Sequence, residues 1–273
     1  DKLTVIGIGA YDVNHLNKGM KHPDDNQKYL LRYLPESKQW SYTIGITYRH
    51  YGKHWNNLFV LSRSTLQNEI EKYTDNNQNR PKSTDYSSGE TENKFRFEHQ
   101  RLLKASIQLN LGTGIEHAAY KNKTVKTLFT QGDISSIHYN HDFHFFKWSF
   151  FGQASKIFGD EKLTLSLGIR ADGNNYFSDM QNPFKQLSPR FSLSYGLTPF
   201  WYINFNVGRY YQLPSYTTMG YANAEGLLVN KDNHLKYIST DHYVAGIEFR
   251  IGDLTRITLE SFYKKYDHYP VSL

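Results

Sequence analysis

The sequence predicts an all-β fold, an antiparallel β-barrel that crosses a membrane, and three observations carry this prediction. Apolar and polar residues alternate with a period of two along many segments, as in strands with one apolar and one polar face. Short turns and much longer polar stretches join these segments in alternation, a pattern typical of transmembrane barrels and not of sandwiches or propellers. Aromatic residues make up 16% of the chain, and tyrosine suits the membrane interface.

The clearest pair of strands lies between Gln186 and Tyr211. Alternating segments on either side are joined by Thr198-Pro199-Phe200, where the proline ring presets φ for a tight turn. The polar positions carry Asn, Ser, Gly and Arg, which suit a wet interior. We expect the apolar positions of this hairpin and of the strand before it to face lipid, namely Leu163, Leu165, Leu167, Ile169, Ile203, Phe205 and Val207.

Taken in order, the alternation gives about eleven strands. They are expected over 3–11, 40–51, 55–63, 91–100, 105–116, 143–158, 163–170, 190–197, 201–208, 235–250 and 256–267. The alternation slips at Phe150-Phe151, where we expect a β-bulge.

The connections fall into two alternating classes. Short turns are expected near Gly52, Arg101, Gly159, Pro199 and Gly252, and long loops over 14–38, 64–90, 121–142, 174–185 and 212–233. The first long loop contains a predicted short helix from Asp24 to Leu34, capped by Asp24 or Asp25. Loops 64–90 and 212–233 are expected to be extracellular and to contribute to ligand capture, because functional residues concentrate on such loops.

Composition excludes several classes of protein. The chain has 273 residues and no cysteine, so disulfides and thiolate zinc sites are excluded. The net charge of +6 is spread over strand ends and loops, which does not favour a nucleic-acid partner. No apolar run approaches the roughly 18 residues of a membrane-spanning helix. The chain opens on Asp1 without a signal peptide, so we expect an excerpt of a longer protein.

Four segments in the second half resemble the barrel of the TonB-dependent outer-membrane receptors, in a style most similar to receptors of Bacteroidota. They are Leu187-Ser188-Pro189-Arg190, the run from Gly208 to Pro214, the run from Asp241 to Glu248 after Leu235-Lys236, and the run from Thr258 to Asp267. Lys236-Tyr237-Ile238-Ser239 departs from the family's usual Lys-Pro-Glu, which affects the register there. Residues 1–140 fit this barrel in pattern only.

The resemblance implies that residues 1–273 are one partial transmembrane β-barrel domain, about eleven strands of a barrel of about 22. The plug domain that fills such barrels is absent from this chain. An odd number of strands would leave two open edges, which lipid does not tolerate. An intact gene from Asp1 to Leu273, or pairing of the first and last strands, would contradict this expectation.

The implied function is TonB-dependent active uptake of a scarce nutrient across the outer membrane of a Gram-negative cell. An iron complex such as a siderophore is the first candidate, before haem, cobalamin or a glycan. The implied partners are the TonB complex, reached through the plug, outer-membrane lipid and a small nutrient ligand. No catalytic residue, cofactor or metal is implied. The alternative is a passive porin or a structural outer-membrane barrel, and a barrel lipase or protease finds no ordered constellation to support it.

Several side chains are candidates for the site. Arg170, Arg190 and Glu248 are expected to point into the lumen, where they would hold the plug or line the ligand path. Tyr210, Tyr211, Tyr216 and Tyr221 cluster near an extracellular strand end, where they would form a ligand-stacking platform or an interfacial girdle. His138, His141 and His144 have a spacing of three, which on a strand alternates faces, so polar histidines are favoured over a site for a metal or haem iron.

Overall fold

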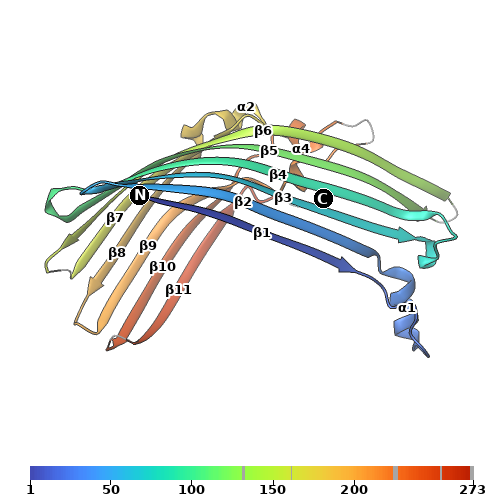
Figure 1. The fold of residues 1–273 in the computed structure, drawn as a ribbon, viewed down its shortest axis with the longest axis horizontal. Helices are drawn as coiled ribbons and strands as arrows, with labels where there is room; N and C mark the ends of the chain where they lie inside the picture. Colours follow the sequence, from blue (N-terminus) through green and yellow to red (C-terminus); the bar gives the residue numbers. More distant parts are fainter. Residues whose placement is uncertain (131–132, 161, 224–226, 253, 271–273) are drawn as a thin grey trace.

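A computed structural model describes residues 1–130, 133–160, 162–223, 227–252 and 254–270. Eleven antiparallel strands form one arched sheet in sequence order (Figure 1), which confirms the predicted all-β fold. Within the described residues each strand pairs only with its sequence neighbours, so the sheet is open between the first strand and the last. The strands are β1 (Lys2–Asn14), β2 (Glu36–Tyr51), β3 (Trp55–Tyr73), β4 (Lys82–Leu102), β5 (Ile107–Thr130), β6 (Asp133–Phe158), β7 (Leu163–Asn174), β8 (Leu187–Gly196), β9 (Trp201–Gln212), β10 (Ile238–Ile251) and β11 (Thr255–Asp267).

Short helices lie between the strands. At one end of the sheet the connections include α1 (Asp25–Tyr33), α2 (Ser178–Gln181), α3 (Tyr216–Met219), α4 (Val229–Asp232) and the 3₁₀ turns η1 (Thr74–Asn76) and η3 (Pro183–Gln186). The turn η2 (Lys104–Ser106) lies at the opposite end. Among the residues described, no helix is long and apolar enough to cross a bilayer.

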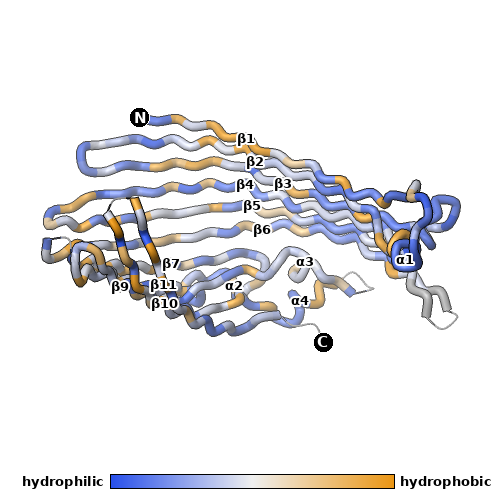
Figure 2. Tube along the Cα trace, turned by 90° about the horizontal axis from the view of Figure 1, so that it is seen from below, coloured by the Kyte–Doolittle hydropathy of each residue, from blue (hydrophilic) through white to orange (hydrophobic). Residues whose placement is uncertain are grey.

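The two faces of the sheet differ in polarity, as the alternation predicts. Phe205 pairs with Leu193 and Ala245 on one face, and its neighbour Asn206 pairs with Ser192 on the other. Leu167 lies on the face of Phe205 and is 64% exposed. We call these the apolar and polar faces; orange and blue alternate along the strands in Figure 2. The set predicted to face lipid shares the apolar face, and its contact with lipid stays a prediction.

The predicted loops 64–90 and 121–142 are wrong, because most of these residues extend the strands β3 to β6. β3 and β4 are joined only across 74–81, and β5 continues to Thr130 before β6 begins at Asp133. Polar residues such as Ser87 and Lys123 pair here in regular register. Where both faces of a hairpin meet water, backbone hydrogen bonds still form but the apolar alternation disappears.

The predicted bulge at Phe150-Phe151 is also wrong. Strand β6 keeps an unbroken register with β5 and β7 through both residues. Phe150 lies on the apolar face, and Phe151 lies on the polar face over Gly112, where an added Cβ would come within 2.3 Å of the Phe151 ring. Gly112 therefore makes room for the Phe151 ring on the polar face. Two adjacent phenylalanines interrupt the apolar–polar alternation in the sequence without any β-bulge in the strand.

The helix predicted at Asp24 is confirmed as α1. The Asp24 side chain accepts a hydrogen bond from the Gln27 backbone, and Gln27 returns one to Asp24, a capping box. At the other end, Asn76 Nδ2 donates to the carbonyls of Leu31 (2.6 Å) and Leu34 (2.8 Å). These contacts tie α1 to the tip of the β3–β4 hairpin.

Asn76→Ala is expected to loosen α1 without affecting the barrel, because two carbonyls at the helix end lose their donor. A net hydrogen bond contributes about 0.5–1.5 kcal/mol, so amide hydrogen exchange of Leu34, whose N–H donates to the carbonyl of Leu30, should become about tenfold faster. The matched control is Asn79→Ala, in the same tip. Equal exchange rates in the two variants would contradict this role of Asn76.

Candidate functional site: a cavity lined by charged residues on the polar face

A buried cluster rich in aromatic residues lies on the polar face of β5 and β6. Ala118, Tyr120 and Phe145 form its wall side. The connections β7–β8 and β9–β10 fold onto this wall, and their buried side chains complete the cluster with Tyr176, Met180, Tyr216, Met219 and Tyr237. These two connections are therefore packed structures.

Hydrogen bonds fix the two connections to each other and to the sheet. Tyr176 donates to the carbonyl of Met219 (2.6 Å), and Asn174 Nδ2 donates to the Tyr237 hydroxyl (2.7 Å). From the wall, Tyr139 donates to the carbonyl of Gly220 at 2.7 Å. Burial raises the pKa of Tyr176 and that of Tyr237 each to about 12, so both hydroxyls stay protonated at neutral pH.

A cluster of ion pairs lies beside the aromatic residues. Lys147 Nζ contacts Glu92 Oε1 at 3.0 Å and also pairs with Glu116, and Lys94 lies 2.5 Å from Glu92 and 3.5 Å from Glu116. Tyr216 enters this cluster from the β9–β10 connection. Its hydroxyl donates to Glu92 and accepts from Lys147 at 2.7 Å. The cluster thus joins three neighbouring strands and one connection.

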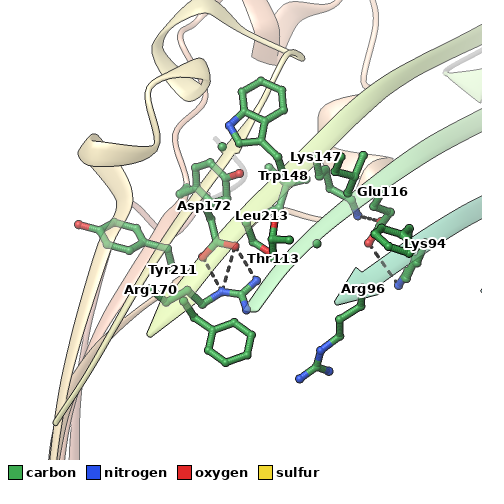
Figure 3. Close-up of a pocket in the computed structure, with 17 residues that line it drawn as sticks. Lys94, Arg96, Thr113, Glu116, Lys147, Trp148, Arg170, Asp172, Tyr211 and Leu213 are labelled. Atoms are coloured by element: carbon green, nitrogen blue, oxygen red, sulfur yellow. Dashed lines mark hydrogen bonds and ion pairs between the residues drawn. The ribbon is translucent and has the colours of Figure 1, made fainter. Parts of the chain in front are cut away.

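A cavity of about 340 Å³ opens beside this cluster (Figure 3). Four cationic side chains line it, together with only two carboxylates, Glu116 and Asp172. Two more carboxylates lie just behind the lining, Glu92 beside Lys94 and Lys147 and Glu98 beside Arg96. The excess of cations is therefore confined to the side chains that line the cavity. The principal lining residues are Lys94, Arg96, Lys147, Trp148, Arg170, Tyr211, Leu213 and Tyr237.

The three charges predicted to point into the lumen all lie on the polar face. Arg170 donates hydrogen bonds from Nε and Nη2 to the Asp172 carboxylate at 2.7–3.0 Å and lines the cavity. The Arg190 guanidinium lies over the Tyr210 ring, 4.4 Å from its centroid. Glu248 is 4% exposed and pairs with two arginines of the β10–β11 hairpin. Their contact with a plug stays a prediction.

The four candidate tyrosines do not form one platform in this structure. Tyr210 packs on Arg190, whereas Tyr211 packs edge-on against Tyr237 and lines the cavity. Tyr221 is 57% exposed. Tyr216 is 8% exposed, so its ring is covered by the wall in this conformation. A ligand-binding role for these tyrosines stays a prediction.

The three histidines do not converge. His138 and His144 lie on the apolar face of β6, and His141 lies on the polar face beside Phe143, with 6.2 Å between ring centroids. Nor do any three His, Cys, Asp or Glu side chains gather in a metal-binding arrangement elsewhere in the described chain.

Lys94, Glu116 and Lys147 are site residues that the sequence patterns did not predict. Each lies at a polar-face position, and an unusual number of opposite charges at such positions was a signal available in the sequence. The pairing of Lys94 with Glu116, and of Glu116 with Lys147, depends on the register of two hairpins whose length the sequence did not reveal.

The comparisons with solved structures reach the same fold. A ferric enterobactin receptor from Pseudomonas aeruginosa is 16% identical, with a TM-score of 0.68, and the match covers 97% of this chain and 40% of that one. The pyoverdine receptor FpvA from P. aeruginosa, bound to pyoverdine, is 14% identical with a TM-score of 0.61, and the match covers 84% of this chain and 36% of that one. The transporter YddB from Escherichia coli is 13% identical with a TM-score of 0.55, and the match covers 80% of this chain and 33% of that one. The chain thus spans about two fifths or less of these receptors.

A search of curated proteins finds no match. The profile of the family described as TonB dependent receptor-like, beta-barrel, matches residues 7–273, nearly the whole chain. Members of this family are outer-membrane transporters rather than enzymes, as the resemblance implied. The chain therefore belongs to the TonB-dependent receptors, and the match is to their β-barrel.

Proposed function

We propose that this chain forms part of the wall and the extracellular mouth of a transporter that imports an anionic iron complex across the Gram-negative outer membrane. One observation carries the choice of ligand, namely the excess of cationic over anionic side chains that line the cavity. Negatively charged ligands are steered into such clefts and held by charge-assisted hydrogen bonds. The solved receptors for ferric enterobactin and pyoverdine share the fold and support this choice.

The remaining partners follow from the family. TonB would act through a plug domain that belongs to another part of the protein. Arg170, Arg190 and Glu248 would contact the plug or the ligand path. Outer-membrane lipid would cover the apolar face. The β9–β10 connection and the tip of the β3–β4 hairpin would contribute to ligand capture. A passive porin or structural barrel is less well supported, because the family match is to active transporters.

The test is growth and uptake by the host strain from which the full gene is deleted. We expect a growth defect on limiting iron supplied as a siderophore complex, restored by the full-length gene, and no defect with cobalamin or glycans. A defect with cobalamin or a glycan and normal iron uptake would reject the iron ligand but keep the transporter. Normal growth on all three would reject the transport function.

Within the complemented strain, Arg96→Gln is expected to raise the KM for ⁵⁵Fe-siderophore uptake about tenfold. The reason is that one hydrogen bond to a charged group contributes about 1.5–3 kcal/mol. The matched control is Lys123→Gln, which removes an exposed cation from the opposite face of β5 and should leave KM unchanged. Equal KM values in both variants would contradict binding of an anion in this cavity.

A further inference from the structure

The segment of residues 213–223, which we call the lid segment, lies against both the wall and the cavity. Its Leu213 lines the cavity together with Lys147. Its Met219 is fully buried in the aromatic cluster. Gly220 lies so close to the wall that an added Cβ would come within 2.8 Å of the Tyr120 and Phe143 rings. The lid segment is therefore seated directly on β5 and β6.

Two kinds of contact hold the lid segment to the wall. Aromatic packing is the first: the Tyr216 ring lies edge-on to Phe145, with centroids 5.7 Å apart. Such packing stabilises by burial and tolerates small shifts. The second is hydrogen bonding: Tyr139 of β6 donates to the carbonyl of Gly220, and the Tyr216 hydroxyl donates to Glu92 and accepts from Lys147. These hydrogen bonds are directional, and those of Tyr216 join the lid segment to charged side chains of the wall.

The charges that hold Tyr216 also serve the cavity. Lys147, Lys94 and Glu116 line the cavity, and all three belong to the ion cluster around Glu92. The three N–H donors of Lys147 are matched by Glu92, Glu116 and the Tyr216 oxygen. Removing the tyrosine hydroxyl leaves one ammonium donor and one carboxylate acceptor without this partner. The lid segment and the cavity wall thus share one hydrogen-bonded network.

We propose that Tyr216, Glu92 and Lys147 form a latch that holds the lid segment closed over the cavity, and that release of the Tyr216 hydroxyl opens it. The lid segment then has two arrangements, docked on the wall or detached, and the latch sets the equilibrium between them. The proposal concerns the lid alone and holds whichever ligand the cavity takes.

The test uses Tyr216→Phe in the full-length receptor in lipid vesicles. A spin label on Thr217→Cys reports the mobility of the lid segment, because Thr217 is exposed and this chain has no native cysteine. Phenylalanine keeps the ring and removes only the hydroxyl. We expect the mobile-to-immobile ratio of the label to rise about tenfold. The matched control, Tyr221→Phe, removes a hydroxyl from an exposed ring in the same segment and should leave the ratio unchanged.

A ratio unchanged by Tyr216→Phe would overturn the latch, because it would show that aromatic packing and the Tyr139–Gly220 hydrogen bond are enough to hold the lid segment. Should Tyr216→Phe not assemble, Glu92→Gln keeps an acceptor for the tyrosine and removes the charge that attracts both lysines. It is expected to raise the mobile fraction to a smaller extent, and an unchanged spectrum there would equally reject the proposal. Amide exchange of Met219 and Gly220, whose N–H groups bond within α3, provides a second readout.

Discussion

Phe145→Ala is expected to destabilise the docking of the lid segment by about 3–5 kcal/mol, the usual loss for a buried aromatic side chain. Phe145 is 2% exposed and contacts both connections, with Tyr176 and Tyr216 edge-on at 5.8 and 5.7 Å between centroids. It projects from β6 opposite Ala118 of β5, two residues from the point where β6 also begins to pair with β7, so the backbone has little freedom to close the resulting space.

Amide hydrogen exchange of Met219 and Gly220 measures this effect in the full-length receptor, and denaturant unfolding of the barrel should change much less. The matched control is the adjacent residue. Phe146→Ala removes the same ring from the opposite face, where it is 46% exposed, and should leave exchange in the lid segment unaltered. Equal acceleration in both variants would show that the cluster does not hold the connections.

Leu167→Arg is expected to destabilise the folded barrel by about 2–4 kcal/mol, since a cation at mid-membrane on a lipid-facing position loses its hydration. Leu167 is 64% exposed and shares the apolar face with Phe191, its cross-strand partner on β8. Reversible unfolding of the full-length receptor in lipid vesicles gives the free energy directly.

The control for this effect is Leu167→Met, a swap of similar volume that keeps the surface apolar and should cost less than about 1.5 kcal/mol. Wild-type stability of the arginine variant would mean that the apolar face of β7 does not contact lipid. That result would remove the assignment of the two faces on which the position of the cavity rests.

Sequence patterns predicted the eleven strands and the two faces because a strand between lipid and water must alternate. This requirement acts locally, so Leu163 to Ile169 and Trp201 to Val207 could be assigned without knowledge of their neighbours. The α1 helix was predictable for the same reason, since its cap at Asp24 lies within one turn. The apolar–polar alternation did not reveal the parts of β3 to β6 within 64–90 and 121–142. Both faces carry polar residues there, so contact with lipid does not impose the alternation.

The site itself required the tertiary structure. Tyr216 and Glu92 are 124 positions apart in the chain, and no periodicity relates a residue in the β9–β10 connection to one on β4. The register of β4, β5 and β6 places Lys94, Glu116 and Lys147 side by side, and the folding of the β9–β10 connection brings Tyr216 to them. The sequence by itself determined the faces, because solvent acts on each residue separately. The cavity and its lid depend on pairing and packing between distant segments, so only the tertiary structure decided them.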